Sequence, residues 1–130
     1  FMDPFPDNGR LTECAKLAYA HEHILQLPLG YHQLVGELGS DLSAGQQQRI
    51  LIARALYRAA PILLLDEGTC HLDQATEQLV MSNILNQACV CIFITHRSEI
   101  AMMADHCVDL GECKSPTIPS PGFRASTQTE

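Results

Sequence analysis

The sequence has little positive charge and lacks any long hydrophobic run. Its 130 residues include 8 Lys and Arg against 15 Asp and Glu, which gives a net charge of −7. Because a nucleic-acid-binding surface needs a basic stripe, this balance argues against such a surface. No apolar run approaches the roughly 18 residues that a membrane-spanning helix requires. The length allows one modest domain, and a hydrophobic content of 46% is sufficient for a core.

Closely spaced metal-binding pairs are also missing. The chain has 6 cysteines and 6 histidines, but no two cysteines form a CxxC pair. The run His21-Glu22-His23 does not have the HExxH spacing of a zinc protease. Since structural zinc sites draw their ligands from tight pairs, the sequence argues against a zinc centre. Reduced thiols in a cytoplasmic protein are the simplest interpretation of the cysteines.

The most informative stretch runs from Leu42 to Asp73. Ser43 followed by Gln46 has the spacing of a capping box, which predicts that a helix begins there. Apolar residues then recur at helical intervals as far as Pro61, which should end the helix. The aliphatic run Ile62–Leu65 is too short for another helix and predicts a strand buried on both faces.

Two carboxylates, Asp66 and Glu67, follow this strand directly. Because ligands bind at the carboxyl ends of strands in open α/β sheets, these residues suit chemistry on a phosphate. One carboxylate can hold Mg²⁺, and the other can orient or deprotonate a water. Backbone N–H groups at Ala44 and Gly45 would offer an anion site. Two simpler interpretations stay open: Ser43 as a helix cap only, and the carboxylates as a solvated strand end.

The segments on either side predict further helices and strands. Residues 1–9 are expected to be irregular, and Leu11–Leu27 to be a helix that ends at Pro28. Leu29–Asp41 is a glycine-punctuated connector. After Asp73, a suitable helix N-cap, four elements are expected. They are a helix over Gln74–Gln87, a buried strand over Cys89–Thr95, a helix over Ser98–Ala104 capped by Ser98, and a third strand over Cys107–Leu110. This order predicts an α/β fold with parallel strands, followed by a disordered tail.

Four motifs in this order resemble those of the ATP-binding cassette (ABC) ATPases. LSAGQQQR, over Leu42–Arg49, resembles the signature motif, and ILLLDE, over Ile62–Glu67, resembles the Walker B strand with its catalytic glutamate. Cys70–Asp73 occupies the place of the D-loop, and Thr95–Arg97 matches the switch-histidine loop. The likeness covers about residues 10 to 111. The run LPLGYHQLVGELG resembles the peptidase-containing bacteriocin exporters of the colicin V class.

The resemblance implies ATP and Mg²⁺ as cofactors and a role for each matching residue. Asp66 would bind Mg²⁺ through water, Glu67 would polarise the attacking water, and His96 would contact the γ-phosphate and couple it to Glu67. Four residues would contact the ATP held by the other subunit of a head-to-tail dimer: Ser43, Ala44 through its N–H, Gly45 and Gln46. Asp73 would help to join the subunits. Taken alone, His96 could equally be an ordinary exposed loop histidine.

The sequence departs from the family pattern in three respects. Gly68, Cys70 and His71 replace the small residues usual before and within the D-loop, and Ala44 replaces a glycine. No GxxxxGK(S/T) occurs, so the loop that cradles the β- and γ-phosphates is expected upstream of Phe1. The resemblance therefore implies roughly the C-terminal half of a nucleotide-binding domain, a partial P-loop NTPase fold without its Walker A strand.

The expected organisation is an irregular segment over 1–9, a partial ABC ATPase domain over 10–111 and a disordered tail over 112–130. Within the domain, 10–60 would be the helical subdomain with the signature helix, and 61–111 the Walker B to switch region. The run Val35–Gly39 would be a loop that touches the membrane domain, or else a plain turn.

Three functions compete. The first is the motor of an ABC exporter of peptides or bacteriocins, with a second nucleotide-binding domain and a transmembrane domain as partners. It would work at the cytoplasmic face of the bacterial inner membrane. The second is a non-catalytic, truncated gene product that retains only the dimerisation face. The third, a DNA-repair type of ABC ATPase, is disfavoured by the negative charge and the absence of heptads.

Overall fold

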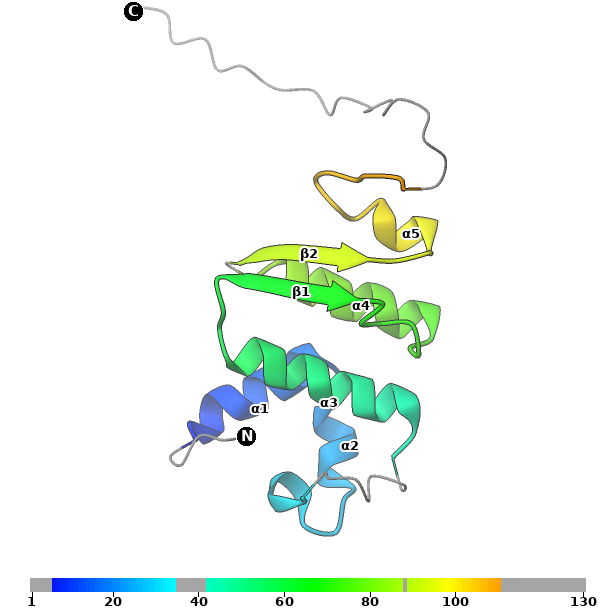
Figure 1. Cartoon of the computed structure of the whole chain (residues 1–130). Helices are drawn as coiled ribbons and strands as arrows, with labels where there is room; N and C mark the ends of the chain where they lie inside the picture. Colours follow the sequence, from blue (N-terminus) through cyan, green and yellow to red (C-terminus); the bar gives the residue numbers. More distant parts are fainter. Residues whose placement is uncertain (1–5, 35–41, 88, 111–130) are drawn as a thin grey trace, which may run out of the picture.

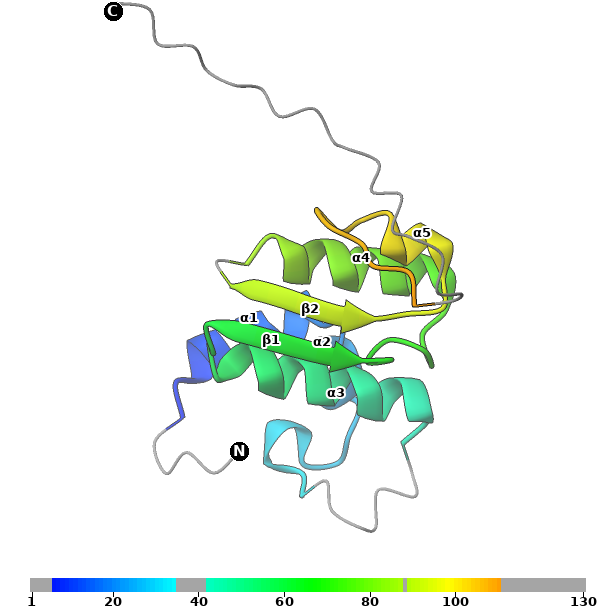
Figure 2. The ribbon, with the colours of Figure 1, turned by 45° about the horizontal axis from the view of Figure 1, so that its top comes forward.

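A pair of parallel strands lies at the centre of the computed structural model, which describes residues 6–34, 42–87 and 89–110 (Figure 1). Strand β1 (Ile62–Asp66) pairs with β2 (Val90–Ile94), with Ile62 opposite Val90 and Asp66 opposite Ile94. Helix α4 (Gln74–Leu85) connects the strands and packs on one face of the sheet (Figure 2). The predicted parallel α/β arrangement is thus confirmed.

The prediction that these strands are buried on both faces was wrong. Leu63 and Leu65 of β1 are buried, whereas Ile62 and Leu64 are 58% and 65% exposed. Strand β2 repeats the pattern, with exposed side chains at its first, third and fifth residues. Within the described residues, α4 covers only one face of the sheet, and the aliphatic side chains on the other face remain open to solvent.

Helix α3 (Ala44–Tyr57) begins as the sequence predicted. The Ser43 N–H donates to Gln46 Oε1 at 2.9 Å, and the Gln46 N–H donates to Ser43 Oγ at 3.2 Å, which is a complete capping box. The helix ends before Pro61 is reached, because Ala59 adopts a left-handed backbone with φ of 47°. The loop that follows leads directly into β1.

The helix expected over Leu11–Leu27 is broken in two. Helix α1 (Asn8–Leu17) is capped by Asp7, so it begins inside the segment expected to be irregular. Tyr19 then takes a left-handed φ of 54°, and α2 (His21–Leu25) starts in a new direction. A 3₁₀ turn, η1 (Gly30–His32), follows. Residues 35–41, including the expected membrane-domain loop, lie outside the described part.

The C-terminal elements are shorter than expected. Helix α5 spans Ser98–Ala101, and its N-cap is Arg97 rather than Ser98. Residues 107–110 form no strand, and Val108 and Leu110 are 77% and 88% exposed. A strand is stabilised by a partner, and no described strand lies beside this segment. The tail from residue 111 onward lies outside the described part.

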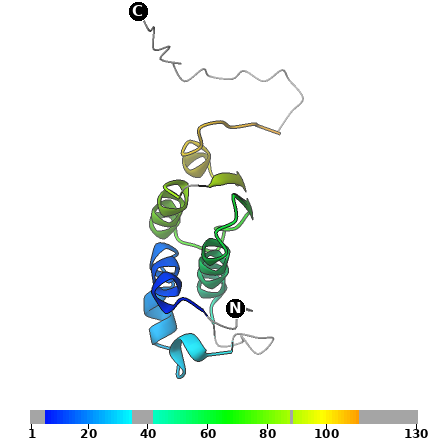
Figure 3. The same ribbon diagram turned by 90° about the vertical axis from the view of Figure 1, so that its left-hand side faces the viewer.

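The buried side chains join these elements into two layers. In the side view of Figure 3, α1 and α4 form one layer, and α3 and the sheet form the other. Side chains from both layers share one core, among them Ile52 of α3, Leu65 of β1, Met81 of α4 and Ile100 of α5. No helix within the described residues has the length and apolar character that crossing a membrane requires.

Candidate functional site

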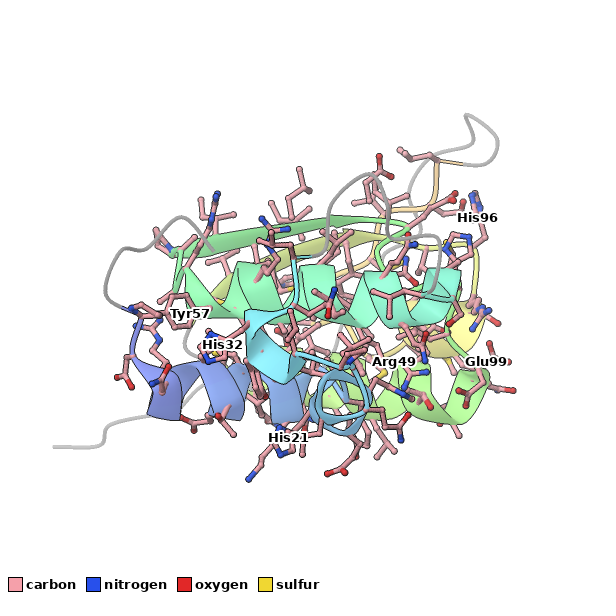
Figure 4. All side chains as sticks on the ribbon, turned by 90° about the horizontal axis from the view of Figure 1, so that it is seen from below. His21, His32, Arg49, Tyr57, His96 and Glu99 are labelled. Carbon is pink, nitrogen blue, oxygen red and sulfur yellow. The ribbon has the colours of Figure 1, made fainter. Side chains whose placement is uncertain are left out.

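The ends of β1 and β2 bring together the two residues expected to be catalytic. Asp66 ends β1, and the N–H of the next residue, Glu67, donates to the Ile94 carbonyl oxygen at 3.2 Å. His96 follows β2, and its Nε2 lies 2.7 Å from Glu67 Oε1. Figure 4 shows His96 at this end of the strands. The parallel register therefore places a carboxylate and an imidazole, 29 residues apart in the sequence, in direct contact.

This pair is open to solvent. The side chains of His96 and Glu67 are 83% and 49% exposed. The Asp66 carboxylate beside them is exposed as well. Water and a phosphate group can therefore reach all three side chains.

The donor set fits Mg²⁺. Mg²⁺ usually keeps several waters and takes one or two carboxylates together with substrate phosphates. The exposed carboxylate of Asp66, at a strand end, matches that need. No group of three or more His, Cys, Asp or Glu side chains that could hold a metal ion occurs among the described residues, so a fully protein-built metal cage is not found there.

Glu67 has an unusual backbone. Its φ of 46° lies in the left-handed region, which is rare for a residue with a long side chain. Such conformations persist where surrounding contacts over-determine them, and they cluster at functional sites. Here the Glu67 carbonyl oxygen accepts from the Cys70 N–H at 3.1 Å and from Gln48 Nε2 at 3.2 Å.

The start of α3 presents a partial anion site. The capping box uses the N–H groups of Ser43 and Gln46, and no described residue accepts from those of Ala44 and Gly45. The Ser43 oxygen accepts a hydrogen bond, so its own O–H can donate to a ligand. Free N–H groups at the positive end of a 14-residue helix favour an anion.

The side chain of Gln46 is already engaged within the chain. Its Oε1 completes the capping box, and its Nε2 lies 3.5 Å from Nδ1 of His23 on α2. On the other side of the same imidazole, Arg49 Nη1 lies 2.6 Å from Nε2. Burial and the nearby Arg49 charge lower the pKa of His23, which favours a neutral ring with one acceptor nitrogen. The ring can therefore accept from Arg49 or from Gln46, but not from both. For Gln46 to contact a ligand, this arrangement has to change.

The loop between Glu67 and α4 is fixed at its C-terminal end by Asp73. The Asp73 carboxylate accepts from the Thr76 N–H at 3.0 Å and caps α4, as the sequence predicted. Hydrogen bonding to the Thr76 side chain, and then to its backbone N–H, lowers the pKa of Asp73. The carboxylate expected at the subunit contact is therefore also a structural cap.

Sequence reasoning missed a buried ion pair beneath this loop. Glu77 of α4 is 1% exposed, accepts from Thr69 Oγ1 at 2.6 Å and pairs with Nη1 of Arg97. The Arg97 guanidinium also donates to the carbonyl oxygens of Leu72 and Cys70 at 3.3 Å. The signal was available, because Glu77 falls in the helical stripe that contains Val80, Met81 and Ile84, a position where an apolar residue is expected.

Comparisons with known proteins agree with this geometry. The family model described as "ABC transporter" matches residues 7–70, which include Ser43, Asp66 and Glu67 but not His96. The colicin V secretion/processing ATP-binding protein of Escherichia coli is 41% identical over 104 residues. These are 80% of this chain and 15% of that protein. The ATP-dependent lipid A-core flippase of Saccharophagus degradans is 48% identical over 101 residues, 76% of this chain and 17% of that protein.

A solved structure supports the same assignment. A bacterial Atm1-family ABC exporter with ATP bound superposes with a TM-score of 0.64 at 43% sequence identity. The match covers 73% of this chain and 17% of that one. The chain thus spans about a sixth of the length of these relatives. It belongs to the ABC transporter family, and its described helices and parallel strands are part of the ABC ATPase fold.

Proposed function

We propose that this chain forms part of the ATP-hydrolysing motor of an ABC exporter, with Glu67 and His96 at its catalytic site. The observation that supports this most directly is the 2.7 Å contact between Glu67 Oε1 and His96 Nε2 at the ends of paired parallel strands. A carboxylate oriented by an imidazole can act as a general base towards water. Phosphoryl transfer needs such a residue to position the nucleophile.

In this mechanism Glu67 orients the attacking water and accepts its proton. His96 holds the Glu67 carboxylate through Nε2 and would also contact the γ-phosphate, so that one side chain links the base to the phosphate. Asp66 would hold Mg²⁺, which would neutralise charge on the β- and γ-phosphates. The exposure of both Glu67 and His96 is compatible with a site that closes only when a second subunit covers it.

That second subunit would be another nucleotide-binding domain in a head-to-tail dimer. The start of α3 would contact the ATP held by this partner through Ser43 and the N–H groups of Ala44 and Gly45, and Gln46 would join them once released from His23. Asp73 would help to join the subunits by holding the shape of the loop that it caps. A transmembrane domain would be the other partner, at the cytoplasmic face of the bacterial inner membrane.

The proposed cargo is a peptide of the bacteriocin type. The match to the colicin V secretion/processing protein, which covers 80% of this chain, supports this proposal. The lipid A-core flippase is more identical over a similar length, so the family match leaves lipid as the competing cargo. Vesicles carrying the assembled exporter, loaded in parallel with a bacteriocin peptide and a labelled lipid, would distinguish the two.

A fusion protein tests the catalytic assignment. This chain would replace its matched 104-residue segment in the colicin V secretion/processing protein. Glu67→Gln should lower ATP turnover by about a hundredfold or more while still permitting ATP-driven dimerisation, because the amide keeps the size but cannot accept a proton. Glu99→Gln, an exposed glutamate on α5, is the matched control. Near-normal turnover of the Glu67 variant would show that this residue is not the base.

A second candidate function rests on one sequence observation, the lack of a GxxxxGK(S/T) segment. In that case the chain would retain only its dimerisation face, and it would bind a complete relative without hydrolysing ATP. Added to a complete relative, it would lower ATPase activity, and Ser43→Arg would abolish that inhibition through bulk and unpaired charge at the anion site. Inhibition that persists in the Ser43 variant would count against this function.

A further inference from the structure

Gln48, on α3, contacts the turn after β1 with both ends of its side-chain amide. Its Nε2 donates to the Glu67 carbonyl oxygen at 3.2 Å, and its Oε1 accepts from the His71 N–H at 3.0 Å. The same Nε2 lies 3.8 Å from the Cys70 sulfur. One side chain therefore satisfies a backbone acceptor at the start of this turn and a backbone donor at its end.

The backbone of α3 approaches the same turn one helical turn earlier. Gly45 is buried, and a Cβ added to it would lie 2.9 Å from the His71 carbonyl oxygen. Residues three apart share one face of a helix, so Gly45 and Gln48 form a single contact surface. Helix α3 thus touches His71 through both its main chain and a side chain.

The bond to Glu67 matters because of the backbone conformation there. A non-glycine residue in the left-handed region is stable only when neighbouring groups hold it. For Glu67, with φ of 46°, those groups are the Ile94 carbonyl, the Cys70 N–H and the Gln48 amide. Of these three, only Gln48 comes from the helix whose first residues form the partial anion site.

We propose, on the basis of the function proposed above, that Gln48 is a positioning residue that couples the start of α3 to the direction of the Glu67 side chain. In a head-to-tail dimer the start of α3 serves the partner's ATP, whereas Glu67 serves the ATP of its own subunit. Within one chain, Gln48 therefore connects two groups that serve two different ATP molecules, one in each subunit. When ATP draws the start of α3 towards the partner, Gln48 carries that movement to the backbone of the base.

Two substitutions separate the two bonds of Gln48. Gln48→Glu keeps an acceptor for the His71 N–H but loses the donor to the Glu67 carbonyl, whereas Gln48→Leu loses both. Gln87→Glu is a matched control, because Gln87 Nε2 donates to the Asn83 carbonyl oxygen at 3.0 Å, far from the loop. It removes the same kind of bond and adds the same charge.

The first measurement is amide hydrogen exchange on the 130-residue chain. In Gln48→Glu, exchange at Cys70, whose N–H bonds to the Glu67 carbonyl, should be about fivefold faster, while His71 stays within about twofold. In Gln48→Leu both amides should exchange faster. Unchanged exchange at Cys70 in both variants would overturn the proposal.

The second measurement uses the ATPase fusion. Gln48→Glu should lower kcat by about tenfold with KM for ATP within about twofold, because the base is misdirected while ATP contacts are kept. Equal turnover in Gln48→Glu and Gln87→Glu would refute the positioning role. If the unmodified fusion hydrolyses no ATP, the proposed function fails, and the exchange data still decide whether Gln48 holds the Glu67 turn.

Discussion

Removing the Arg97 guanidinium should destabilise the protein more than neutralising Glu77. The Glu77 side chain is 1% exposed and that of Arg97 is 39% exposed, so the two partners are desolvated very unequally. In Arg97→Leu a buried carboxylate keeps only the Thr69 hydroxyl as a partner. Because Arg97 is partly solvated, we expect a loss of about 2 to 4 kcal/mol, below the roughly 3 to 5 kcal/mol typical of breaking a fully buried pair.

Neutralising the carboxylate should have a smaller effect. In Glu77→Gln the partly exposed Arg97 can be hydrated, so about 1 to 2 kcal/mol is expected. The double variant contains no buried charge and should therefore be more stable than Arg97→Leu alone. This reversal is specific to a buried ion pair and is not expected of two independent packing contacts.

Urea unfolding of the four proteins in the cycle measures these differences. Arg58→Leu, an exposed arginine at the end of α3, controls for loss of a positive charge and should change stability by less than about 1 kcal/mol. Equal losses for Arg97→Leu and Glu77→Gln, or a double variant as unstable as the sum of the single ones, would refute the reasoning.

Three further predictions concern the chain by itself. Calorimetry should detect no micromolar binding of Mg-ATP, because the amides and lysine of a GxxxxGK(S/T) loop are not in this sequence. Micromolar binding would contradict the expectation that this loop supplies most of the phosphate contacts. The open sheet face should cause self-association, so Leu64→Lys should reduce light scattering, whereas Leu79→Lys, at an exposed leucine of α4, should not. Hydrogen bonding lowers the pKa of Asp73, so its stabilisation is present above the unfolded-state pKa and lost as pH falls through the folded value. Asp73→Asn should therefore flatten the pH dependence of the melting temperature below about pH 4, and an unaltered profile would exclude this role.

Local signals predicted the starts of α3 and α4 and the strand pair. The capping box at Ser43 and the cap at Asp73 depend on residues three apart, so sequence spacing is sufficient to find them. The contact between Glu67 and His96 could also be anticipated, because both follow adjacent parallel strands. The roles assigned to them remain predictions until turnover is measured.

Features that depend on tertiary contacts were not predictable in this way. The break at Tyr19 places α2 against α3, a rearrangement that the helical periodicity of Leu11–Leu27 did not indicate. The partners of Gln48 and Arg97 lie on distant segments, and no spacing rule connects them. Burial on both faces of β1 was inferred from aliphatic content, but the described part of the chain covers one face only.

The left-handed backbone at Glu67 sets folding stability against activity at one residue. Holding a long side chain in this region costs on the order of 1 kcal/mol, a penalty that asparagine or glycine largely avoids. Glu67→Asn should therefore raise the melting temperature while abolishing any base at this position. A selection for thermal stability alone would be expected to remove the glutamate. If Glu67→Asn instead lowered the melting temperature, the contacts of the Glu67 side chain would outweigh the backbone strain.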